Sequence, residues 1–502
     1  MAKIAAIDVG SNAMRMVVGE VDESWRMKVL ENIRLPVRLG QDVFSEGTLQ
    51  KSTIQQTEDA FLRFKHMAEN YNVQKMRAVA TSAAREASNS DLLIDRVFRA
   101  SGIELELISG EEEARLIHQA VIHELNLKNK RTLLIDIGGG SIEVTTSTGQ
   151  NIVSTESYDM GTVRLLEKLD SKSKAKHFAR LLREYAEAAR YRIERDIGEE
   201  KIQVCAATGG NPEEIGRLCQ KLFKSDSDRY VTMSELKRLI ERLDDLSYEE
   251  RITKLKLRPD RADVILPACV VLHMISSEAG VKQIAIPNVG LKDGILLDIV
   301  EELSHFPQPH RREQAWESAL HMGRKYEFDE AHALLTARLS ARLFEQSQSL
   351  HDLDESNLLL LEMAALLHDI GHFINSLDHE KHGFYLLTTN RLFGLSAREQ
   401  KIVASLVLYH RKKLSPSTDD DNFKSLSQKD RILVNKLSAL LRLADGIDIS
   451  HSNSVNDVTL TETKSCWKIK LYGKRDMMLA NWALKNRKSL FEEVFGVNLE
   501  IE

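Results

Sequence analysis

The sequence predicts an α/β fold for roughly the first 300 residues, an all-helical domain after it, and a small α+β domain at the C-terminal end. Short β-rich runs alternate with helical patterns in the first part, which is typical of an α/β domain. A Gly-rich segment near the N-terminus recurs once further along this part. After the Pro-containing stretch 306–310, which reads as a linker, the pattern changes to helix after helix until about Ile449.

Composition supports a globular enzyme-sized chain. The 502 residues suffice for about three or four compact domains. Hydrophobic residues at 42%, charged residues at 29% and only 8 prolines exclude wholesale disorder and fibrous repeats. The net charge of −6 argues against a dedicated nucleic-acid binder, although a local basic groove remains compatible with it.

The cysteines and the apolar runs indicate the cellular compartment. The four cysteines are scattered without a CxxC pair, so neither a disulfide framework nor a thiolate zinc site is expected. No stretch of 18 uninterrupted apolar residues occurs. Asp8 and Gly10 interrupt the first apolar run after too few residues for the hydrophobic core of a signal peptide. We therefore expect a cytoplasmic protein that does not associate with a membrane.

The predicted elements define four segments. In the first part, strands are expected at 4–7, 76–81, 103–108 and 132–137, with helices at 53–71, 90–100 and 109–125. A second α/β stretch follows, with strands at 204–207 and 283–286, and strand-like alternation returns at 455–472 before a closing helix. These patterns predict domains at 1–126, 127–306, 307–450 and 451–502.

An internal repeat is the most informative feature of the sequence. Residues 7–17 (IDVGSNAMRMV) align with 135–145 (IDIGGGSIEVT) at one constant offset of 128 residues. Each copy is a strand that ends in an acidic residue, a Gly-rich turn and a second strand, a geometry that points backbone N–H groups at an anion. Two such hairpins would clamp phosphate from both sides, whereas either copy alone could be ordinary hairpin chemistry.

These two segments resemble the phosphate motifs of the actin-like (ribonuclease H-like) superfold and, more narrowly, those of the exopolyphosphatase and guanosine pentaphosphate phosphohydrolase family. Further matches to that family are ATSAAREA (80–87), ISGEEEARLI (108–117), MGTVRL (160–165), ATGG (207–210), RADVILPA (261–268) and IPNVGLKDGIL (286–296). The resemblance implies duplicated actin-like domains, hydrolysis of inorganic polyphosphate or guanosine pentaphosphate, and a homodimer.

Phosphoanhydride hydrolysis needs donors on the phosphate oxygens, usually a divalent cation, and a carboxylate that activates water. Asp8, Asp136 and Glu143 are placed to hold Mg²⁺, although Asp8 and Asp136 could also be turn-capping residues. The residues that can bind phosphate lie in the two Gly-rich turns: Gly10, Ser11, Asn12, Gly138, Gly139, Gly140 and Ser141.

Three consecutive glutamates at a helix start offer the water-activating base. With Ser109 as N-cap, Glu112 occupies the third helical position, where a capping box uses its carboxylate on the helix itself. Glu113 lies about 100° further round and stays free to face the cleft. The family's catalytic glutamate falls on Glu113, although all three could simply complement the helix dipole.

Further residues gain a role only from the resemblance. Arg85 and Arg38 match arginines that approach the scissile phosphate, and Gly209 and Gly210 match a position where relatives hold nucleotide or pass substrate. Each arginine alone could be a surface ion-pair partner, and the glycines could only allow a tight turn. A basic helix face could steer a polyanion or be merely solvated; it comprises Lys172, Lys174, Lys176, Arg180 and Arg183.

The helical domain carries a second possible metal site. EMAALLHDIGH (362–372) resembles the motif of HD-domain metal phosphohydrolases, and His332 and Asp445 complete a set with His368 and Asp369. Imidazole and carboxylate ligands suit Mn²⁺, Fe²⁺ or Mg²⁺. Additional nitrogen donors, sufficient in number for a second metal, are His379, His382 and His410. A folded relic without metal is the alternative.

The sequence therefore predicts a Mg²⁺-dependent hydrolase with Glu113 as base and Arg85 as a charge stabiliser. Three other functions stay open. An actin-like kinase would share both phosphate loops, but the GEEEARL helix disfavours it. A sensor of guanosine tetraphosphate or pentaphosphate in the stringent response would bind without releasing phosphate. An HD-domain phosphohydrolase with regulatory front domains would place the chemistry at His368 and Asp369.

Overall fold

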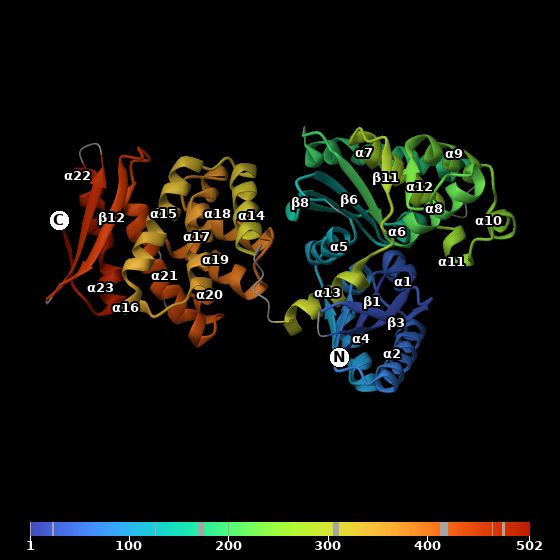
Figure 1. Cartoon of the computed structure of the whole chain (residues 1–502), viewed down its shortest axis with the longest axis horizontal. Helices are drawn as coiled ribbons and strands as arrows, with labels where there is room; N and C mark the ends of the chain where they lie inside the picture. The colour runs from blue at the N-terminus through green and yellow to red at the C-terminus, as the bar shows by residue number, and fades with distance from the viewer. Residues whose placement is uncertain are drawn as a thin grey trace. The chain divides into compact units, whose positions relative to one another are not determined.

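The computed structural model divides into an N-terminal unit, Met1–Pro307, and a C-terminal unit, Gln308–Glu502 (Figure 1). The predicted linker and basic helix face lie outside the described residues and side chains. In the described part of the chain, no helix combines the length and apolarity needed to cross a membrane. The structure describes residues 2–22, 25–125, 127–168, 175–198, 200–304, 311–411, 420–463, 465–473 and 477–502.

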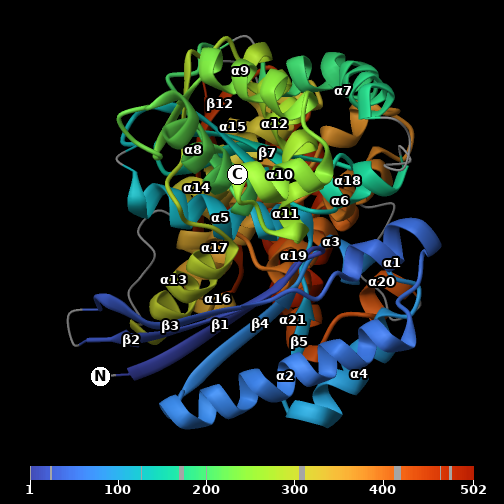
Figure 2. The same cartoon turned by 90° about the vertical axis from the view of Figure 1, so that its right-hand side faces the viewer.

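The first sheet of the N-terminal unit has the strand order β3-β2-β1-β4-β5. An antiparallel meander comprises β1 (Ala2–Val9), β2 (Met14–Val21) and β3 (Met27–Leu35). Two parallel strands, β4 (Lys75–Ala80) and β5 (Leu105–Leu107), extend it. Two helices, α2 (Lys51–Tyr71) and α4 (Ser90–Ser101), cover one side of this sheet (Figure 2), and their buried apolar residues form part of its core.

The second sheet repeats this arrangement, in the order β10-β11-β9-β6-β7-β8. Its meander is β6 (Arg131–Ile137), β7 (Ile142–Thr148) and β8 (Asn151–Tyr158), followed in parallel by β9 (Val204–Thr208) and β11 (Gln283–Ala285), with β10 (Tyr230–Thr232) at the edge. Asp8 pairs with Arg15 in the first hairpin and Asp136 with Glu143 in the second. The 128-residue repeat is therefore a structural repeat, and the predicted duplicated actin-like fold is confirmed. The third strand of each meander was missed by the sequence analysis.

Two helices fill the space between the sheets. The first, α5 (Gly110–Glu124), contacts β7 and β8 on one side and α13 (Leu291–Ser304) on the other. Because α13 packs on β1, β2 and β4, the last segment of the predicted 127–306 domain lies against the first sheet. We propose that the first lobe includes α13. The outer face of the second sheet is covered by α7 (Ala175–Ile197), α8 (Gly210–Phe223), α9 (Met233–Asp244) and α12 (Ile265–Glu278).

Shorter helices complete the N-terminal unit. Both lobes contribute to them, and α1 contacts α6 across the boundary between the lobes. They are α1 (Leu39–Glu46), α3 (Ser82–Glu86), α6 (Thr162–Lys168), α10 (Tyr248–Leu255) and α11 (Pro259–Ala262).

The C-terminal unit is a helical bundle followed by a small sheet. Its helices are α14 (Arg311–Lys325), α15 (Glu330–Gln346), α16 (Gln348–His351), α17 (Glu355–Leu367), the 3₁₀ helix η1 (Ile370–Phe373), α18 (His379–Thr389), α19 (Ala397–Tyr409), α20 (Asp421–Lys424) and α21 (Gln428–Ile447). The sheet comprises β12 (Val455–Glu462), β13 (Trp467–Gly473) and β14 (Leu499–Ile501), with α22 (Met478–Arg487) and α23 (Ser489–Phe495). Both parts contribute to one hydrophobic core, so the predicted boundary at residue 450 divides a single core.

Candidate active site

The two Gly-rich turns face each other across a cleft in the N-terminal unit. The Gly10 N–H donates to Ala13 O and the Gly138 N–H to Ser141 O, both at 3.1 Å, so each glycine amide closes its own turn. A Cβ on Gly139 would lie 3.0 Å from Cβ of Ser11, so a larger residue would have to displace its neighbour where the turns approach. Gly10, Ser11, Asn12, Gly138, Gly139 and Ser141 all line the cleft, as predicted for phosphate-binding residues.

Three buried carboxylates meet at this cleft. Oxygen atoms of Glu113, Asp136 and Glu143 lie within 4.8 Å of one another, and these residues are 7%, 7% and 1% exposed. Ser157 donates to Glu143 Oε1 at 3.0 Å, and Thr208 donates to Asp136 Oδ1 at 2.5 Å. Among the described residues, the second oxygens of Glu113 and Glu143 have no hydrogen-bond partner. Such a group of hard oxygen donors fits a divalent cation such as Mg²⁺.

The group of carboxylates that the structure brings together differs from the predicted metal set in one member. The structure groups the predicted base, Glu113, with Asp136 and Glu143. Asp8, which was predicted as a ligand, lines the same cleft and raises the pKa of Asp136. The roles of Asp8 and Glu113 toward a cation stay predictions.

Burial makes these carboxylates difficult to ionise. Desolvation raises the pKa of Glu113 well above its ordinary value, and the neighbouring Glu143, Asp136 and Asp8 raise it further. The same causes raise the pKa of Glu143 to about 7 and that of Asp136 to about 6. A bound cation would offset this repulsion and return the groups toward their charged form.

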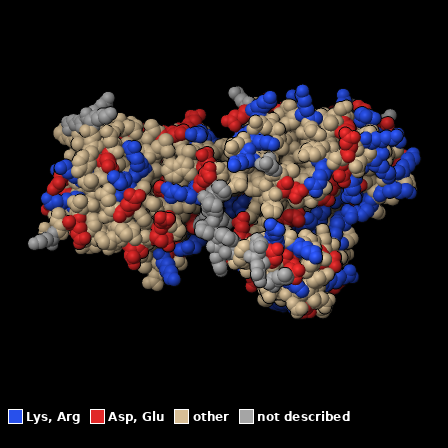
Figure 3. Space-filling view, in the orientation of Figure 1, with Lys and Arg blue, Asp and Glu red and all other residues tan. Residues whose placement is uncertain are grey.

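The cleft also carries three arginines that the sequence analysis missed: Arg15, Arg34 and Arg261. Arg261 is 6% exposed and donates to Asn211 Oδ1 at 2.8 Å. Burial and the nearby charges of Arg15 and Arg34 lower its pKa to about 10. Arg34 forms an ion pair with Asp260, and phosphate oxygens suit the geometry of guanidinium groups gathered in this way. Figure 3 shows Lys and Arg beside the groove between the two lobes.

Signals for these arginines were present in the sequence. Arg15 occupies the position in the first repeat that Glu143 occupies in the second. Arg261 begins the segment RADVILPA, which carried part of the family resemblance. A Cβ on Gly210 would collide with Arg261 and lie 2.9 Å from Nη2 of Arg15, so this glycine makes room for both guanidiniums. Gly209, with φ of 97°, and Gly210 begin α8, whose N-terminus also favours an anion.

Arg85, Arg38 and Gly140 surround the cleft without forming its lining. Arg85 donates to Ile108 O at 2.5 Å, and its charge lowers the pKa of Glu113 and Glu143. Arg38 donates to Asn12 Oδ1 at 2.7 Å and to Asp263 at 2.8 Å, which ties the first turn to the second lobe. Gly140 packs against Ser82, and its carbonyl accepts from Arg164 at 2.6 Å.

The start of α5 positions Glu113. The Ser109 hydroxyl accepts from Glu112 N–H at 3.2 Å, as predicted for an N-cap. The Glu112 carboxylate pairs with Arg115 at 2.8 Å and with Arg77 at 3.5 Å, so its structural role comes through ion pairs. Glu113, one position further, faces the other carboxylates.

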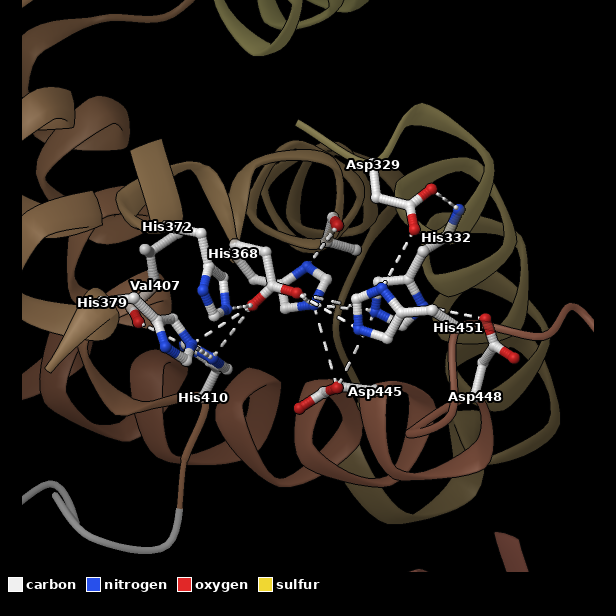
Figure 4. A network of polar contacts seen from close by, with 12 residues as sticks. Asp329, His332, His368, His372, His379, Val407, His410, Asp445, Asp448 and His451 are labelled. Atoms are coloured by element: carbon white, nitrogen blue, oxygen red, sulfur yellow. Dashed lines mark hydrogen bonds and ion pairs between the residues drawn. The ribbon is translucent and has the colours of Figure 1, made fainter. Parts of the chain in front are cut away.

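The predicted metal ligands of the C-terminal unit also converge (Figure 4). The Nε2 atoms of His332 and His368 are 3.2 Å apart. Asp369 Oδ2 lies 3.9 and 3.5 Å from them, and Asp445 Oδ1 lies 3.9 and 3.8 Å from them. The sequence predicted His382 as a further nitrogen donor. In the structure, His372 is the residue that groups with Asp369 and His379.

Two actin-like domains that enclose guanidinium groups and buried carboxylates define a hydrolase of phosphoanhydride bonds. The Ppx/GppA phosphatase family matches residues 16–303, and domain III of the Ppx/GppA phosphatases matches residues 316–493. The chain belongs to this family.

Curated relatives cover most of the chain. The guanosine-5'-triphosphate,3'-diphosphate pyrophosphatase of Photobacterium profundum is 27% identical over 453 residues, which is 88% of this chain and 85% of the relative. The protein of that name in Aliivibrio fischeri is 25% identical over 470 residues, 91% of this chain and 92% of the relative.

Solved structures share the fold over about three fifths of the chain. A Ppx/GppA family member from Aquifex aeolicus has a TM-score of 0.53 and 23% identity, covering 61% of this chain and 99% of its own. An exopolyphosphatase from Cytophaga hutchinsonii has a TM-score of 0.55 and 21% identity, covering 60% and 98%.

Proposed function

We propose that the N-terminal unit removes the terminal phosphate from inorganic polyphosphate, from guanosine pentaphosphate, or from both, with Glu113 activating the attacking water. The observation that carries this proposal is the position of Glu113. Its carboxylate is buried beside Asp136 and Glu143, and one oxygen has no partner among the described residues. A base needs a free lone pair to accept the proton of the water, and this oxygen has one.

The residues around Glu113 would bind the phosphates and stabilise the ionised carboxylates. Arg15, Arg34 and Arg261 bind the negatively charged phosphates, and the N-terminus of α8 adds N–H donors. The amides of Gly10 and Gly138 donate hydrogen bonds within their own turns. The residues that follow these glycines would therefore contact the phosphates. Arg85 keeps positive charge near Glu113 and Glu143, which favours the ionised form of both.

Asp136 and Glu143 would hold Mg²⁺, which supplies charge neutralisation on the phosphate oxygens when it is bound. Burial and the neighbouring carboxylates raise the pKa of Glu113, whereas Arg85 lowers it, and a bound cation would also favour the ionised carboxylate that a base requires. The homodimer and the cytoplasmic location expected from the sequence stay predictions.

Replacing Glu113 by Gln tests the proposal. Phosphate release from long-chain polyphosphate and from guanosine pentaphosphate is measured side by side with Mg²⁺. We expect kcat to fall roughly 10²- to 10⁴-fold with little change in KM, because the amide fills the same volume but cannot accept the proton. Glu111→Gln, on the same helical turn, is the matched control and should keep wild-type kcat.

Near-normal turnover in Glu113→Gln would remove this residue from the mechanism. Tight binding of guanosine pentaphosphate by the wild type without any phosphate release would instead favour the sensor. The ratio of the two wild-type activities assigns the preferred substrate.

A further inference from the structure

The second lobe contains a cavity of about 690 Å³ at the edge of its sheet that lies opposite the active-site cleft. The parallel strands β6, β9 and β11 begin at this edge, and the lining comes from the residues that lead into them: Lys130, 201–205 and 280–283. Leu125 and Leu127, which follow α5, and Tyr230, which begins β10, complete the wall. The volume is typical of a small-molecule site.

The charged side chains on the described lining of this cavity are all lysines: Lys130, Lys201 and Lys282. Two acidic residues that flank the lining in sequence, Glu124 and Glu200, pair instead with Arg229 at 2.7 Å and with Arg131 at 3.2 Å. Within the described ranges, the three ammonium groups have no carboxylate partner of their own. Positive charges gathered around one concavity attract an anion.

The remaining wall of the cavity is largely apolar. Its side chains are Leu125, Leu127, Ile202, Val204, Cys205, Val281 and Ala285. Tyr230, which is 47% exposed, adds an aromatic ring. A small inorganic anion would gain nothing from this surface, whereas an anion that carries a ring would bury the ring against it.

Two glutamines add hydrogen-bonding groups to the same wall. Gln203 Oε1 accepts from the Arg131 N–H at 2.8 Å, which orients the side-chain amide and leaves its NH₂ group as a donor. Gln283, at the start of β11, contributes a second amide. Nucleobases stack on aromatic side chains and use their polar edges for hydrogen bonds, so Tyr230 with these two amides suits a base.

Two elements connect the cavity with the cleft. Lys130 directly precedes β6, and Asp136 near the other end of this strand is one of the cleft carboxylates. Leu125 ends α5, whose first turn carries Glu113. Each of these elements is about 20 Å long. A ligand that orders one end of a rigid element can act on groups at its other end, which is how distant sites become coupled.

We propose that this cavity is an effector site for a nucleoside diphosphate. The base packs against Tyr230 and the apolar wall, the phosphates face the three lysines, and occupancy changes turnover in the cleft through β6 and α5. The binding is independent of the hydrolysis proposed for the N-terminal unit, whereas the effect on turnover rests on it.

Lysine footprinting tests binding at this place. The full chain is acetylated briefly with and without millimolar ADP, in chelator, and the modified lysines are quantified by mass spectrometry. We expect ADP to slow the acetylation of Lys130, Lys201 and Lys282 several-fold. Lys237 is the internal control, because it is exposed on α9 of the same lobe and outside the cavity lining, and its acetylation should not change.

Adenosine and pyrophosphate separate the two halves of the ligand. Adenosine lacks the charges and pyrophosphate lacks the ring, so each should protect the lysines several-fold less than ADP at equal concentration. GDP is measured in parallel, and protection by either nucleotide supports the site. Equal protection by pyrophosphate and ADP would overturn the role of the base, and no protection by ADP or GDP would overturn the site.

Kinetics test the effector role. Phosphate release from saturating long-chain polyphosphate is measured with and without ADP at constant free Mg²⁺. We expect ADP to change kcat of the wild type, because a nucleotide that only competes in the cleft would raise KM and leave kcat unchanged. The double variant Lys201→Gln, Lys282→Gln should keep the wild-type kcat without ADP and lose the response to it.

Lys237→Gln is the matched control, since it removes one exposed lysine of the same lobe outside the cavity, and it should respond to ADP as the wild type does. A wild type in which ADP raises KM alone, or a double variant with the full kcat response, would overturn the effector role. Wild-type protein that releases no phosphate would contradict the proposed hydrolysis, and the footprint would still decide the binding.

Discussion

The N-terminal cleft and the C-terminal cluster both bury like groups that repel one another, but they do so with different atoms. The cleft gathers carboxylate oxygens beside arginines, and the cluster gathers imidazole nitrogens around one aspartate. Hard oxygen donors suit Mg²⁺, whereas imidazoles suit Mn²⁺ or Fe²⁺. The two groups of residues therefore offer ligand atoms that suit different classes of cation.

The two regions also differ in how their donors are oriented. In the cleft, oxygens of Glu113 and Glu143 lack partners among the described residues. In the cluster, a hydrogen bond at Nδ1 fixes each of four histidine rings, those of His332, His368, His379 and His410. We interpret the cluster as preorganised by the protein, and the cleft as a site whose carboxylates gain their charge-compensating contacts with cation and substrate.

His118 of α5 sharpens this comparison, because it is a buried histidine outside any metal group of the described residues. It is 3% exposed, its Nε2 has no described partner, and burial lowers its pKa from 6.5 to about 4. The unfolded chain therefore takes up a proton below pH 6.5, while the folded chain stays neutral until about pH 4. Stability should be lost as the pH falls through this window.

The expected loss is about 3 kcal/mol of unfolding free energy, since one pKa unit corresponds to about 1.4 kcal/mol. Hydrogen exchange of the α5 amides, measured with chelator at pH 7, 5.5 and 4, should show this loss in the wild type. His118→Leu should lack that component of the pH dependence. Parallel wild-type and variant profiles would show that His118 gains a proton or partner when folded.

Arg15 tests whether the two copies of the repeat have divided their roles. It takes the place of Glu143 in the first hairpin and lowers the pKa of Asp8 and Asp136. Arg15→Gln should lower kcat/KM roughly 10- to 100-fold, the range for losing a hydrogen bond to a charged group. The acidic limb of the pH–rate profile should also move to higher pH, because the carboxylates lose a stabilising charge.

Arg63→Gln is the control for this substitution, since Arg63 is exposed on α2 of the same lobe. Its kinetics should match those of the wild type. Unchanged kcat/KM in Arg15→Gln would mean that Arg15 stabilises the hairpin without contacting substrate.

The parts of the molecule that sequence reasoning predicted are those with local signals. Each copy of the repeat is a continuous segment of eleven residues that can be recognised in the sequence. The orientation of Glu113 was predicted from its position one helical turn after the N-cap Ser109. Arg15 and Arg261 each lie in a segment with a sequence signal, but their grouping in one cleft could not be predicted in this way, because the packing of the two lobes brings them together.

The histidine cluster shows the same limit. The adjacent pair His368 and Asp369 can be recognised as a motif in the sequence. Which of the following histidines lie close to Asp369 depends on how the chain folds after it, and this cannot be read from their spacing. His372 lies in the 3₁₀ helix η1, which turns it toward Asp369, whereas His382 lies on α18 away from the donor sets. The return of α13 to the first sheet is likewise a long-range packing result that spacing cannot indicate.

The smallest expected effect concerns the cap that positions Glu113. The hydroxyls of Ser109 on α5 and Ser247 on α10 each accept from a helix N–H at 3.2 Å, so their capping bonds match in length. Replacing either serine by Ala should reduce the unfolding free energy by about 1 kcal/mol.

Only Ser109→Ala should also lower kcat, because α5 carries Glu113 four residues later, whereas Glu113 and its partner carboxylates lie outside α10. A fraying first turn would let Glu113 leave its productive position for part of the time, which lowers kcat while KM changes little. Equal kcat in Ser109→Ala and Ser247→Ala, at equal loss of stability, would show that Glu113 keeps its position without help from the helix cap.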